Sequence, residues 1–281
     1  MTSTETGNDP RAELDAFHER RRRAVTSRQG NLALVNTQWI TGDPDAAAQP
    51  VWGVPGLWSP LPKGVSGLKV TAAASEGIVV DGELVDGETI VAGKDSINPS
   101  SIVFDDTTTG YVIASDDGDY ALRVWDAASE AIGDFGSIDA FPYDPEWVVE
   151  ANYTPIEGGS IVGIEHLKDE GRTRDKVVPA SITFSKDGVD YDLAAFQDDG
   201  GLLLVFADAT NGDSSYSVGR FMRVTPGQNG TITLDFNRAY LPPCAFSYNF
   251  NCPMPPAQNR FAVPIEAGEK NVLARNGELL H

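Results

Sequence analysis

The chain has 281 residues, of which 41% are hydrophobic and 9% aromatic, so it can build a large core without disulfide staples. Its 41 acidic and 21 basic residues give a formal net charge of -20, which repels nucleic acid and anionic membranes and argues against both as partners. No apolar run approaches the roughly 20 residues of a transmembrane helix, and the residues after the arginine run 20–23 are too polar for a secretory signal, so we expect a cytoplasmic protein.

The acidic excess also indicates the kind of cytoplasm. At ordinary ionic strength, so many like charges repel one another and oppose compaction. Near molar salt the screening length falls to about 3 Å, and this repulsion is screened. We therefore interpret the acidic surface as the solvation layer of a halophilic protein, and not as a docking face for a cationic partner.

The segment 9–28 predicts a helix at the N-terminus. Asp9 is a suitable cap, and Pro10 suits the first helical position. The run 20–23 consists of four arginines that wind around this helix. We expect them to form a solvated face that offsets nearby acidic residues.

From residue 30 to residue 67, closely spaced prolines exclude long regular elements. Trp39, Trp52 and Trp58 lie in this stretch, and we expect them to cover a hydrophobic core. The resulting domain prediction is an N-terminal helix with a Pro/Trp-rich segment, residues 1–66, packed on a β domain of residues 67–281.

After residue 67 the sequence predicts short strands. Asp-Gly pairs between apolar runs indicate β-hairpins, because both central positions of a tight hairpin turn require positive φ. These pairs are Asp81-Gly82, Asp86-Gly87, Asp117-Gly118 and Asp187-Gly188. The continuous apolar run 202–206 is typical of a central strand, with 216–224 and 231–236 as its successors. The predicted fold is mainly β: an antiparallel β-sandwich or partly closed barrel with an N-terminal helix.

The sequence lacks the common catalytic signatures. It has no phosphate-binding P-loop, no dinucleotide-binding glycine fingerprint and no serine in a nucleophile elbow. Its three histidines are far apart, so no metal site is predicted, and the identity of any cofactor is open.

Cys244 and Cys252 enclose seven residues, a spacing unlike the C-x-x-C of zinc ribbons and redox motifs. Prolines on both flanks fix φ and could hold the two sulfur atoms close together. Two interpretations remain open: a buried thiol pair that packs in the core, or a disulfide or reactive thiol.

Polar side chains concentrate in the C-terminal third, and several follow the predicted strand 202–206, where loops on rigid strands commonly carry function. The candidate acid–base residues are Asp208, Tyr216, Tyr240 and Glu269, and the candidate ligand-binding residues are Arg220, Asp235, Asn237 and Asn259. In a strand, Tyr216 and Arg220 would point to the same face. Arg220 would then either pair with a carboxylate of the fold or hold a carboxylate or phosphate of a ligand.

The same region carries a family resemblance. The stretch DFNRAYLPPCAF at 235–246, CPMPP at 252–256 and IEAGEK at 265–270 resemble the signature of the family called domain of unknown function 1684. FADAT at 206–210 and LRVWD at 122–126 also resemble it, and the likeness covers roughly residues 95–270. Leu241 stands where the family pattern usually has asparagine, and Phe261 where it has leucine. The resemblance implies a prokaryotic protein and implies no activity.

Two functions remain open from the sequence. In the first, the polar residues form a pocket that binds or processes a small anionic metabolite, with Arg220 as its anchor and a tyrosine as proton donor. In the second, they form an internal hydrogen-bond network that braces a proline-rich loop of a structural or interaction protein. The first requires a concave pocket that reaches Arg220, and the second requires every group to be paired within the fold. Enzymatic activity and oligomeric state are open.

Overall fold

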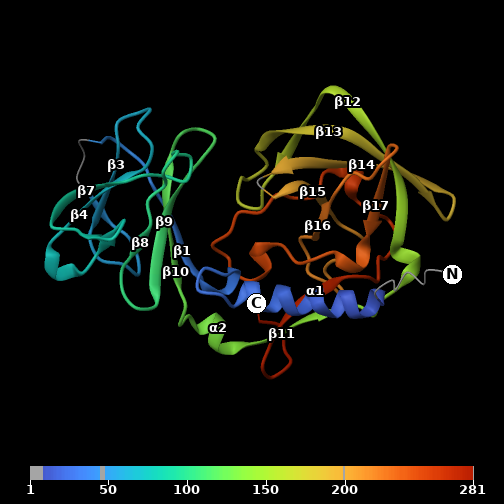
Figure 1. Cartoon of the computed structure of the whole chain (residues 1–281), viewed down its shortest axis with the longest axis horizontal. Coiled ribbons are helices and arrows are strands. Elements are labelled where there is room, and N and C mark those ends of the chain that lie inside the picture. The colour runs from blue at the N-terminus through green and yellow to red at the C-terminus, as the bar shows by residue number, and fades with distance from the viewer. Residues whose placement is uncertain (1–8, 45–47, 199, 281) are drawn as a thin grey trace, which may run out of the picture. The chain divides into compact units, whose positions relative to one another are not determined.

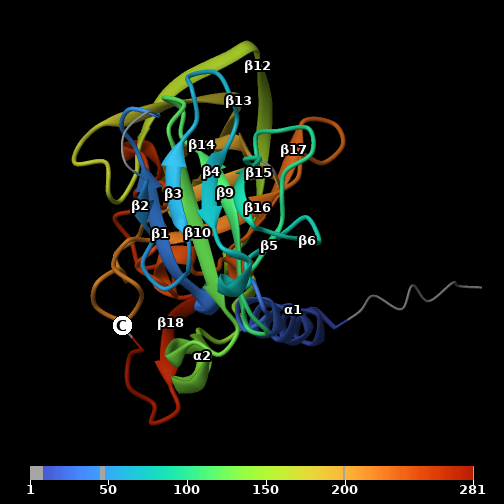
Figure 2. The same cartoon turned by 90° about the vertical axis from the view of Figure 1, so that its left-hand side faces the viewer.

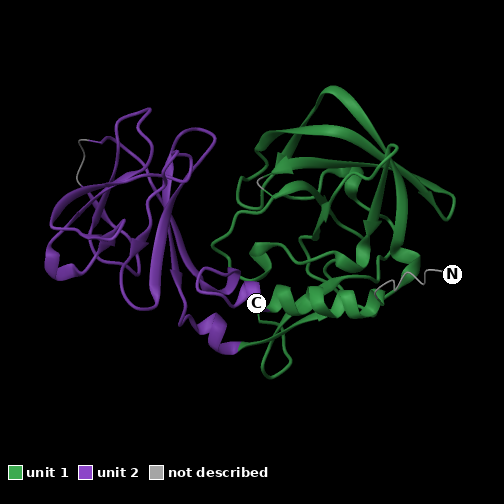
Figure 3. Cartoon of the chain, viewed as in Figure 1, with its two compact units in different colours: residues 1–22, 135–281 green, residues 23–134 purple. Residues whose placement is uncertain are grey.

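The computed structural model describes residues 9–44, 48–198 and 200–280, and the chain forms two compact units (Figure 3). Unit 2 comprises residues 23–134, and unit 1 comprises residues 1–22 and 135–281. Unit 2 is therefore an insertion in the sequence of unit 1. The domain boundary that we expected at residues 66–67 falls between two strands, β3 (Leu57–Pro60) and β4 (Leu68–Ala72), that pair with each other within unit 2.

Unit 2 consists of two antiparallel sheets (Figures 1 and 2), with strand orders β1-β10-β9-β8-β5-β6 and β2-β3-β4-β7. The strands of the first sheet are β1 (Leu34–Ile40), β5 (Val79–Val80), β6 (Glu83–Leu84), β8 (Ile102–Val103), β9 (Thr108–Ala114) and β10 (Tyr120–Asp126). Those of the second are β2 (Gln49–Pro50), β3 (Leu57–Pro60), β4 (Leu68–Ala72) and β7 (Gly87–Val91). Two single-turn helices, η1 (Asn31–Ala33) and η2 (Ala74–Glu76), and the short helix α2 (Glu130–Asp134) complete it.

Both sheets of unit 2 contribute to one hydrophobic core, which makes this unit a small β-sandwich. Trp58 is fully buried in this core. The prediction for the other two tryptophans was wrong, because Trp39 is 42% exposed and Trp52 is 69% exposed. Since side chains alternate along β1, the burial of Ile40 turns its neighbour Trp39 to the outer face.

Three of the four Asp-Gly hairpins are confirmed. Asp81-Gly82 joins β5 to β6 with φ of 53° and 89°, and Asp187-Gly188 closes another hairpin with φ of 52° and 78°. Asp117-Gly118 lies in the longer loop between β9 and β10. The hairpin predicted at Asp86-Gly87 was wrong, because the strand that follows, β7, pairs with β4 instead of with β6. Local turn chemistry does not determine which distant strand a segment pairs with.

Unit 1 contains the helix α1 (Pro10–Val25), which extends into unit 2 after residue 22, and a six-stranded antiparallel sheet of order β16-β15-β14-β13-β12-β17 (Figure 1). The strands are β12 (Val148–Glu165), β13 (Thr173–Lys186), β14 (Val189–Asp198), β15 (Gly201–Phe206), β16 (Arg220–Val224) and β17 (Thr231–Asp235). A two-stranded sheet pairs β11 (Phe135–Ala140) with β18 (Glu269–Ala274). Single-turn helices are η3 (Pro145–Trp147), η4 (Phe236–Arg238), η5 (Pro243–Ala245) and η6 (Ala257–Asn259).

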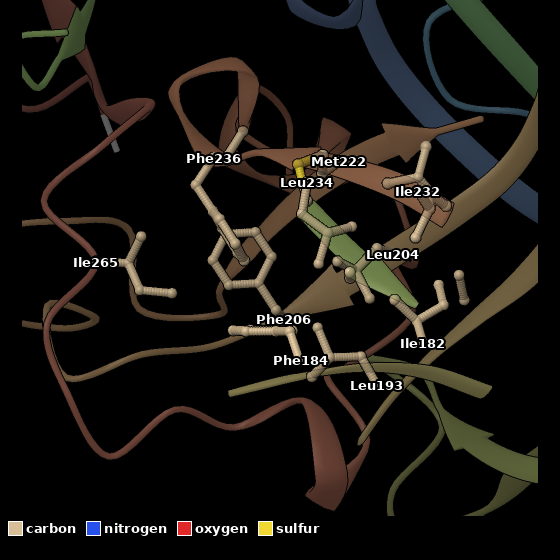
Figure 4. Packing of buried hydrophobic residues seen from close by; sticks show 14 of the residues in the cluster. Ile182, Phe184, Leu193, Leu204, Phe206, Met222, Ile232, Leu234, Phe236 and Ile265 are labelled. Atoms are coloured by element: carbon tan, nitrogen blue, oxygen red, sulfur yellow. The ribbon is translucent and has the colours of Figure 1, made fainter. Parts of the chain in front are cut away.

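The central strand β15 is buried on both faces, which explains its continuous apolar sequence. Leu204 and Phe206 pack into the main core of unit 1, beside Phe236 and Ile265 (Figure 4). Leu203 packs into a second cluster on the opposite face, where Cys244 and Cys252 also lie. The proline-rich C-terminal segment therefore covers a face of the sheet that would otherwise be exposed.

The fold-class prediction is confirmed: the chain is mainly β with antiparallel sheets, the large sheet curls into a half-barrel, and a helix lies near the N-terminus. The Asp9 carboxylate accepts the Arg11 N–H at 3.0 Å at the start of α1, as the sequence predicted for this cap. None of the helices among the described residues is both long and apolar enough to cross a membrane.

Candidate functional site

The polar residues of the C-terminal third are organised around one buried arginine. Arg220 is fully buried, and its Nη2 lies 2.7 Å from Oδ2 of Asp208, whose side chain is also fully buried. Nη2 also donates to the Ile265 carbonyl at 2.8 Å, and Nη1 donates to the Ala267 carbonyl and, at 3.4 Å, to that of Glu269. The other oxygen of Asp208 accepts the N–H groups of Thr210, at 2.9 Å, and of Ile265. The guanidinium therefore holds a carboxylate and three carbonyls of its own fold.

The sequence explains where Asp208 and Arg220 lie along the chain, but it does not explain which way the Arg220 side chain points. Asp208 follows the buried strand β15, and Arg220 opens β16, where it pairs in register with Phe206. The prediction that Tyr216 and Arg220 share one strand face was wrong, because Tyr216 lies in the loop before β16 begins. The Arg220 side chain points to the C-terminal segment 265–269, a partner that local sequence does not reveal.

A second buried ion pair joins Glu269 to the N-terminal helix. The Glu269 carboxylate is fully buried, and Arg21 contacts both of its oxygens, Nε at 2.8 Å and Nη2 at 3.1 Å. The same carboxylate accepts the Leu241 N–H at 2.7 Å, and Arg21 donates to the Leu241 carbonyl. Arg21 also lies 4.7 Å from the centre of the Tyr240 ring. The expectation that the whole arginine run 20–23 is solvated was wrong for Arg21, which is 16% exposed.

Gly268 makes this arrangement possible. Its φ is +83°, and a Cβ atom at this position would lie 2.7 Å from the carbonyl oxygens of Phe236 and Ala239. The chain therefore needs a residue without a side chain where the segment that carries Glu269 passes η4. The Glu269 N–H then donates to the Ala239 carbonyl at 2.9 Å.

The predicted amides also bind the backbone. Asn259 is fully buried and bridges two strands, with its Nδ2 donating to the carbonyls of Ala194 and Val205 at 2.8 and 2.7 Å and its Oδ1 accepting the Ala194 N–H. Asn237 forms the same kind of bridge to the backbone of Asp144 and also donates to Asp235 at 3.0 Å. Each asparagine side chain therefore pairs with backbone N–H and C=O groups in place of another backbone segment.

The structure thus brings Asp208, Arg220 and Glu269 together, with Asn259, Asn237 and Asp235 bracing neighbouring segments. The two predicted tyrosines each lie in the wall of a cavity, and Tyr240 also adjoins Arg21, the partner of Glu269. Burial raises the pKa of both Tyr216 and Tyr240, so each phenol stays protonated at neutral pH. Neither cavity is lined by Arg220.

The first cavity, which we call the Tyr240 cavity, has a volume of about 320 Å³ and lies over one face of the large sheet. Its wall is mostly apolar and aromatic: Phe196, Leu203, Phe221, Tyr240, Phe250 and Pro253. This volume is in the range of small-molecule sites, which combine apolar walls with a few polar groups.

The polar groups of the Tyr240 cavity are mainly basic: Lys176, Arg223 and His166, with Asp198 as the acidic residue in the lining. Arg223 forms an ion pair with Asp198, and both side chains are partly exposed. Lys176 has no carboxylate partner within 4 Å among the residues that the structure describes. Burial lowers the pKa of His166, so this ring is neutral at neutral pH. Lys176 therefore supplies a cation that the fold leaves uncompensated.

A cluster around Asp169 fixes one side of this cavity. Arg174 holds both oxygens of Asp169, at 2.7 and 2.9 Å, and Asn251 donates to the carboxylate at 2.8 Å. These bonds, first of all that from Arg174, lower the pKa of Asp169 to about 2. Because Asn251 and His166 line the cavity, the cluster ties its rim to the end of β12.

The second cavity, which we call the Tyr216 cavity, has a volume of about 350 Å³ and is lined by Tyr216, Cys244, Tyr248 and Asn271 among others. The thiol of Cys244 contacts both the Tyr216 hydroxyl and Cys252. No group of three or more His, Cys, Asp or Glu side chains within the described ranges could hold a metal ion.

Sequence reasoning did not identify Arg21, Lys176 or Arg223. Arg21 was hidden in a run of four arginines, and its partner lies 248 residues away. Lys176 and Arg223 stand on β13 and β16, two strands of one sheet that are separated by β14 and β15. A cation on a strand of so acidic a chain is the one signal that could have drawn attention to them.

Comparison with known proteins supports the resemblance seen in the sequence. Residues 133–270 match the model of the family described as protein of unknown function (DUF1684). The resemblance of the chain to this family is therefore confirmed over residues 133–270. The matching segment lies almost entirely in unit 1 and contains both cavities except for a few residues after position 270.

Among solved structures, the chain is similar to an uncharacterized protein of Haloarcula marismortui studied by solution NMR. The sequences are 37% identical, the match covers 48% of this chain and 77% of the other, and the TM-score is 0.40. None of the curated proteins matches the chain.

Replacing Arg220 by methionine should strongly destabilise unit 1. The change leaves the Asp208 carboxylate buried without its counterion, and breaking such pairs costs about 3–5 kcal/mol. We expect this loss in urea unfolding followed by circular dichroism. The matched control is Arg238→Met, since Arg238 pairs with Glu13 at the surface and its loss should cost about 1 kcal/mol or less. Equal unfolding midpoints for the two variants would contradict the structural role of Arg220.

The Asp169 cluster predicts a specific pH dependence. The folded-state pKa of about 2 lies below the unfolded value of about 3.9, so this carboxylate stabilises the fold above pH 4 and loses that contribution as the pH falls towards 2. Asp169→Asn should therefore lower the free energy of unfolding at pH 7 by about 2 kcal/mol, and the gap to wild type should close between pH 4 and pH 2. Urea unfolding across this range measures it.

Asp187→Asn is the control, because Asp187 is 87% exposed in a hairpin turn that asparagine also tolerates. Its difference from wild type should be small and nearly independent of pH. A gap for Asp169→Asn that persists unchanged at pH 2 would show that the carboxylate charge is not what stabilises the cluster.

Proposed function

We propose that the protein binds a small organic anion in the Tyr240 cavity. The observation that supports this most is the uncompensated Lys176, which lines the same apolar cavity as Arg223 in a chain whose net charge is -20. Solvation of the protein by its acidic surface does not require a lysine at this cavity. A lysine positioned where the walls are aromatic is suited to a ligand that carries a negative charge on an apolar body.

The cavity indicates the chemical class of the ligand. Phe196, Phe221 and Phe250 offer area to an aromatic or branched aliphatic group, and Lys176 and Arg223 offer donors to a carboxylate. The Tyr240 phenol stays protonated, because burial raises its pKa, and it supplies a further donor. The anchor is therefore not Arg220, the residue that the sequence suggested for this role. A small aromatic or branched carboxylate fits best.

We further propose a structural role for the network of Asp208, Arg220, Asn259 and Glu269. Each of these side chains is buried and bonded to other groups of the fold. They join segments between strands that have few backbone partners of their own. This is the second of the two functions left open by the sequence, and it applies to a different set of residues from those of the cavity.

The binding proposal is tested by thermal shift and calorimetry in molar KCl, with benzoate, phenylacetate, 3-methylbutanoate and inorganic phosphate as probes. A ligand at about 100 times its Kd adds about 2.7 kcal/mol to stability, which is easily measured. We expect the aromatic carboxylates to stabilise the wild type and Lys176→Met to weaken binding at least tenfold. Uncharged benzamide should have no effect.

Arg275→Met is the matched control, since it removes one positive charge from an exposed residue of unit 1 that does not line the cavity. It should bind like the wild type. If no carboxylate stabilises the wild type, or if Lys176→Met and Arg275→Met bind equally, the anion site is not in this cavity.

We also propose that the protein works in a salt-rich prokaryotic cytoplasm. The support is its charge: 41 acidic against 21 basic residues, a surplus whose self-repulsion concentrated salt screens. The surface ion pairs that the structure describes involve few of these acidic side chains.

The expected result is an unfolding midpoint that rises steadily as KCl increases from about 0.1 M to about 3 M, because the Debye length falls over this range from about 10 Å to below 3 Å. Sucrose of equal osmolality serves as the control for an effect on water alone. A midpoint that is the same in low and high KCl would contradict the proposal.

A further inference from the structure

The two cysteines meet in the wall between the two cavities. The Cys244 N–H donates to Sγ of Cys252 at 3.2 Å, and both residues are buried, 1% and 3% exposed. Cys244 lines the Tyr216 cavity, and Cys252 lines the Tyr240 cavity. The two cysteines therefore border different hollows.

The local chain holds the Cys252 sulfur against Cys244. Cys244 lies in η5, directly after two prolines, and Cys252 precedes Pro253. The Leu167 N–H donates to the Cys252 carbonyl at 2.9 Å, which fixes this residue to the end of β12. The seven residues between the cysteines carry no regular secondary structure after η5 ends, so the short loop is free of a sheet register that bond formation would break.

The surroundings favour Cys244 as the nucleophile. Hydrogen bonds from Cys252 and from the Tyr216 hydroxyl lower the pKa of the Cys244 thiol, although burial opposes them. Burial and the neighbouring thiols raise the pKa of Tyr216, so its hydroxyl remains a donor to a thiolate. The thiolate is the reactive form of cysteine in disulfide exchange.

We propose that Cys244 and Cys252 are a reactive dithiol that exchanges with small disulfides entering the Tyr216 cavity. The Cys244 thiolate attacks one sulfur of a disulfide RSSR, which forms the Cys244–SR bond and releases RS⁻. The Cys252 thiol then loses its proton and attacks the Cys244 sulfur, which releases the second RS⁻. The protein is oxidised by two electrons to the Cys244–Cys252 disulfide, and RSSR is reduced to two RSH once each RS⁻ takes up a proton.

This activity is independent of carboxylate binding, because it uses the other cavity and other side chains. The test uses the full chain in molar KCl with 2-hydroxyethyl disulfide, a neutral probe that the acidic surface does not repel, followed by acid quenching and mass spectrometry. Wild type should lose two hydrogen atoms and yield the Cys244–Cys252 linked peptide. Cys252→Ser should retain a mixed disulfide on Cys244, and Cys244→Ser should react at least about tenfold more slowly.

Tyr216→Phe in the Cys252→Ser chain separates chemistry from packing. Loss of the hydroxyl donor should raise the pKa of the Cys244 thiol and move the pH profile of adduct formation to higher pH, with an unchanged circular dichroism spectrum. A thiol pKa that is higher by about 1 should slow the reaction at pH 7 about tenfold, because the thiolate fraction falls in proportion. The proposal is overturned if folded wild type keeps both thiols in the presence of the probe. It is overturned equally if reaction requires urea that unfolds the chain, or if the two single-cysteine variants react at the same rate.

Discussion

A guanidinium sealed inside a protein must find its counterions within the fold, and the burial of Arg220 imposes this constraint on unit 1. An isolated buried charge would cost many kcal/mol, so Asp208 and the carbonyls of segment 265–269 have to converge on it. That convergence fixes a stretch without regular structure, which in turn places Glu269 where Arg21 of α1 can reach it. The two buried ion pairs, Arg220–Asp208 and Arg21–Glu269, thus hold α1, β16 and the C-terminal segment together.

The elements that the sequence predicted are those determined by neighbouring residues. The cap at Asp9, the turn at Asp187-Gly188 and the doubly buried run of β15 each follow from local chemistry. The pairing of β7 with β4 and the insertion of unit 2 into unit 1 do not, since both depend on which distant segments meet. The same distinction holds for the candidate site. The high density of polar residues in the C-terminal third could be seen in the sequence, but only the fold shows which of these residues face each other and which face a cavity.

The region of highest polar density and the proposed ligand cavity are different places in this molecule. The residues richest in hydrogen-bonding groups, such as Arg220 and Asn259, direct those groups to the backbone of the fold. The Tyr240 cavity has few polar groups, and Lys176 is conspicuous there because no carboxylate of the described chain neutralises it. The binding proposal therefore follows from an uncompensated cation at a cavity, and not from the cluster of conventional acid–base residues. The segment that matches the family contains both sets of residues, so a shared motif by itself does not separate them.

The insertion of unit 2 has a consequence for the order in which the protein is made. Residues of α1 are synthesised before the rest of unit 1, but Arg21 meets Glu269 only after 248 further residues have been added. Unit 2 has its own core and its own strand pairs within residues 23–134, so it can collapse during this interval. Unit 1 depends on contacts of very long sequence separation, which slow folding. Arg21 therefore stays in contact with water until the last third of the chain has been synthesised and Glu269 can pair with it.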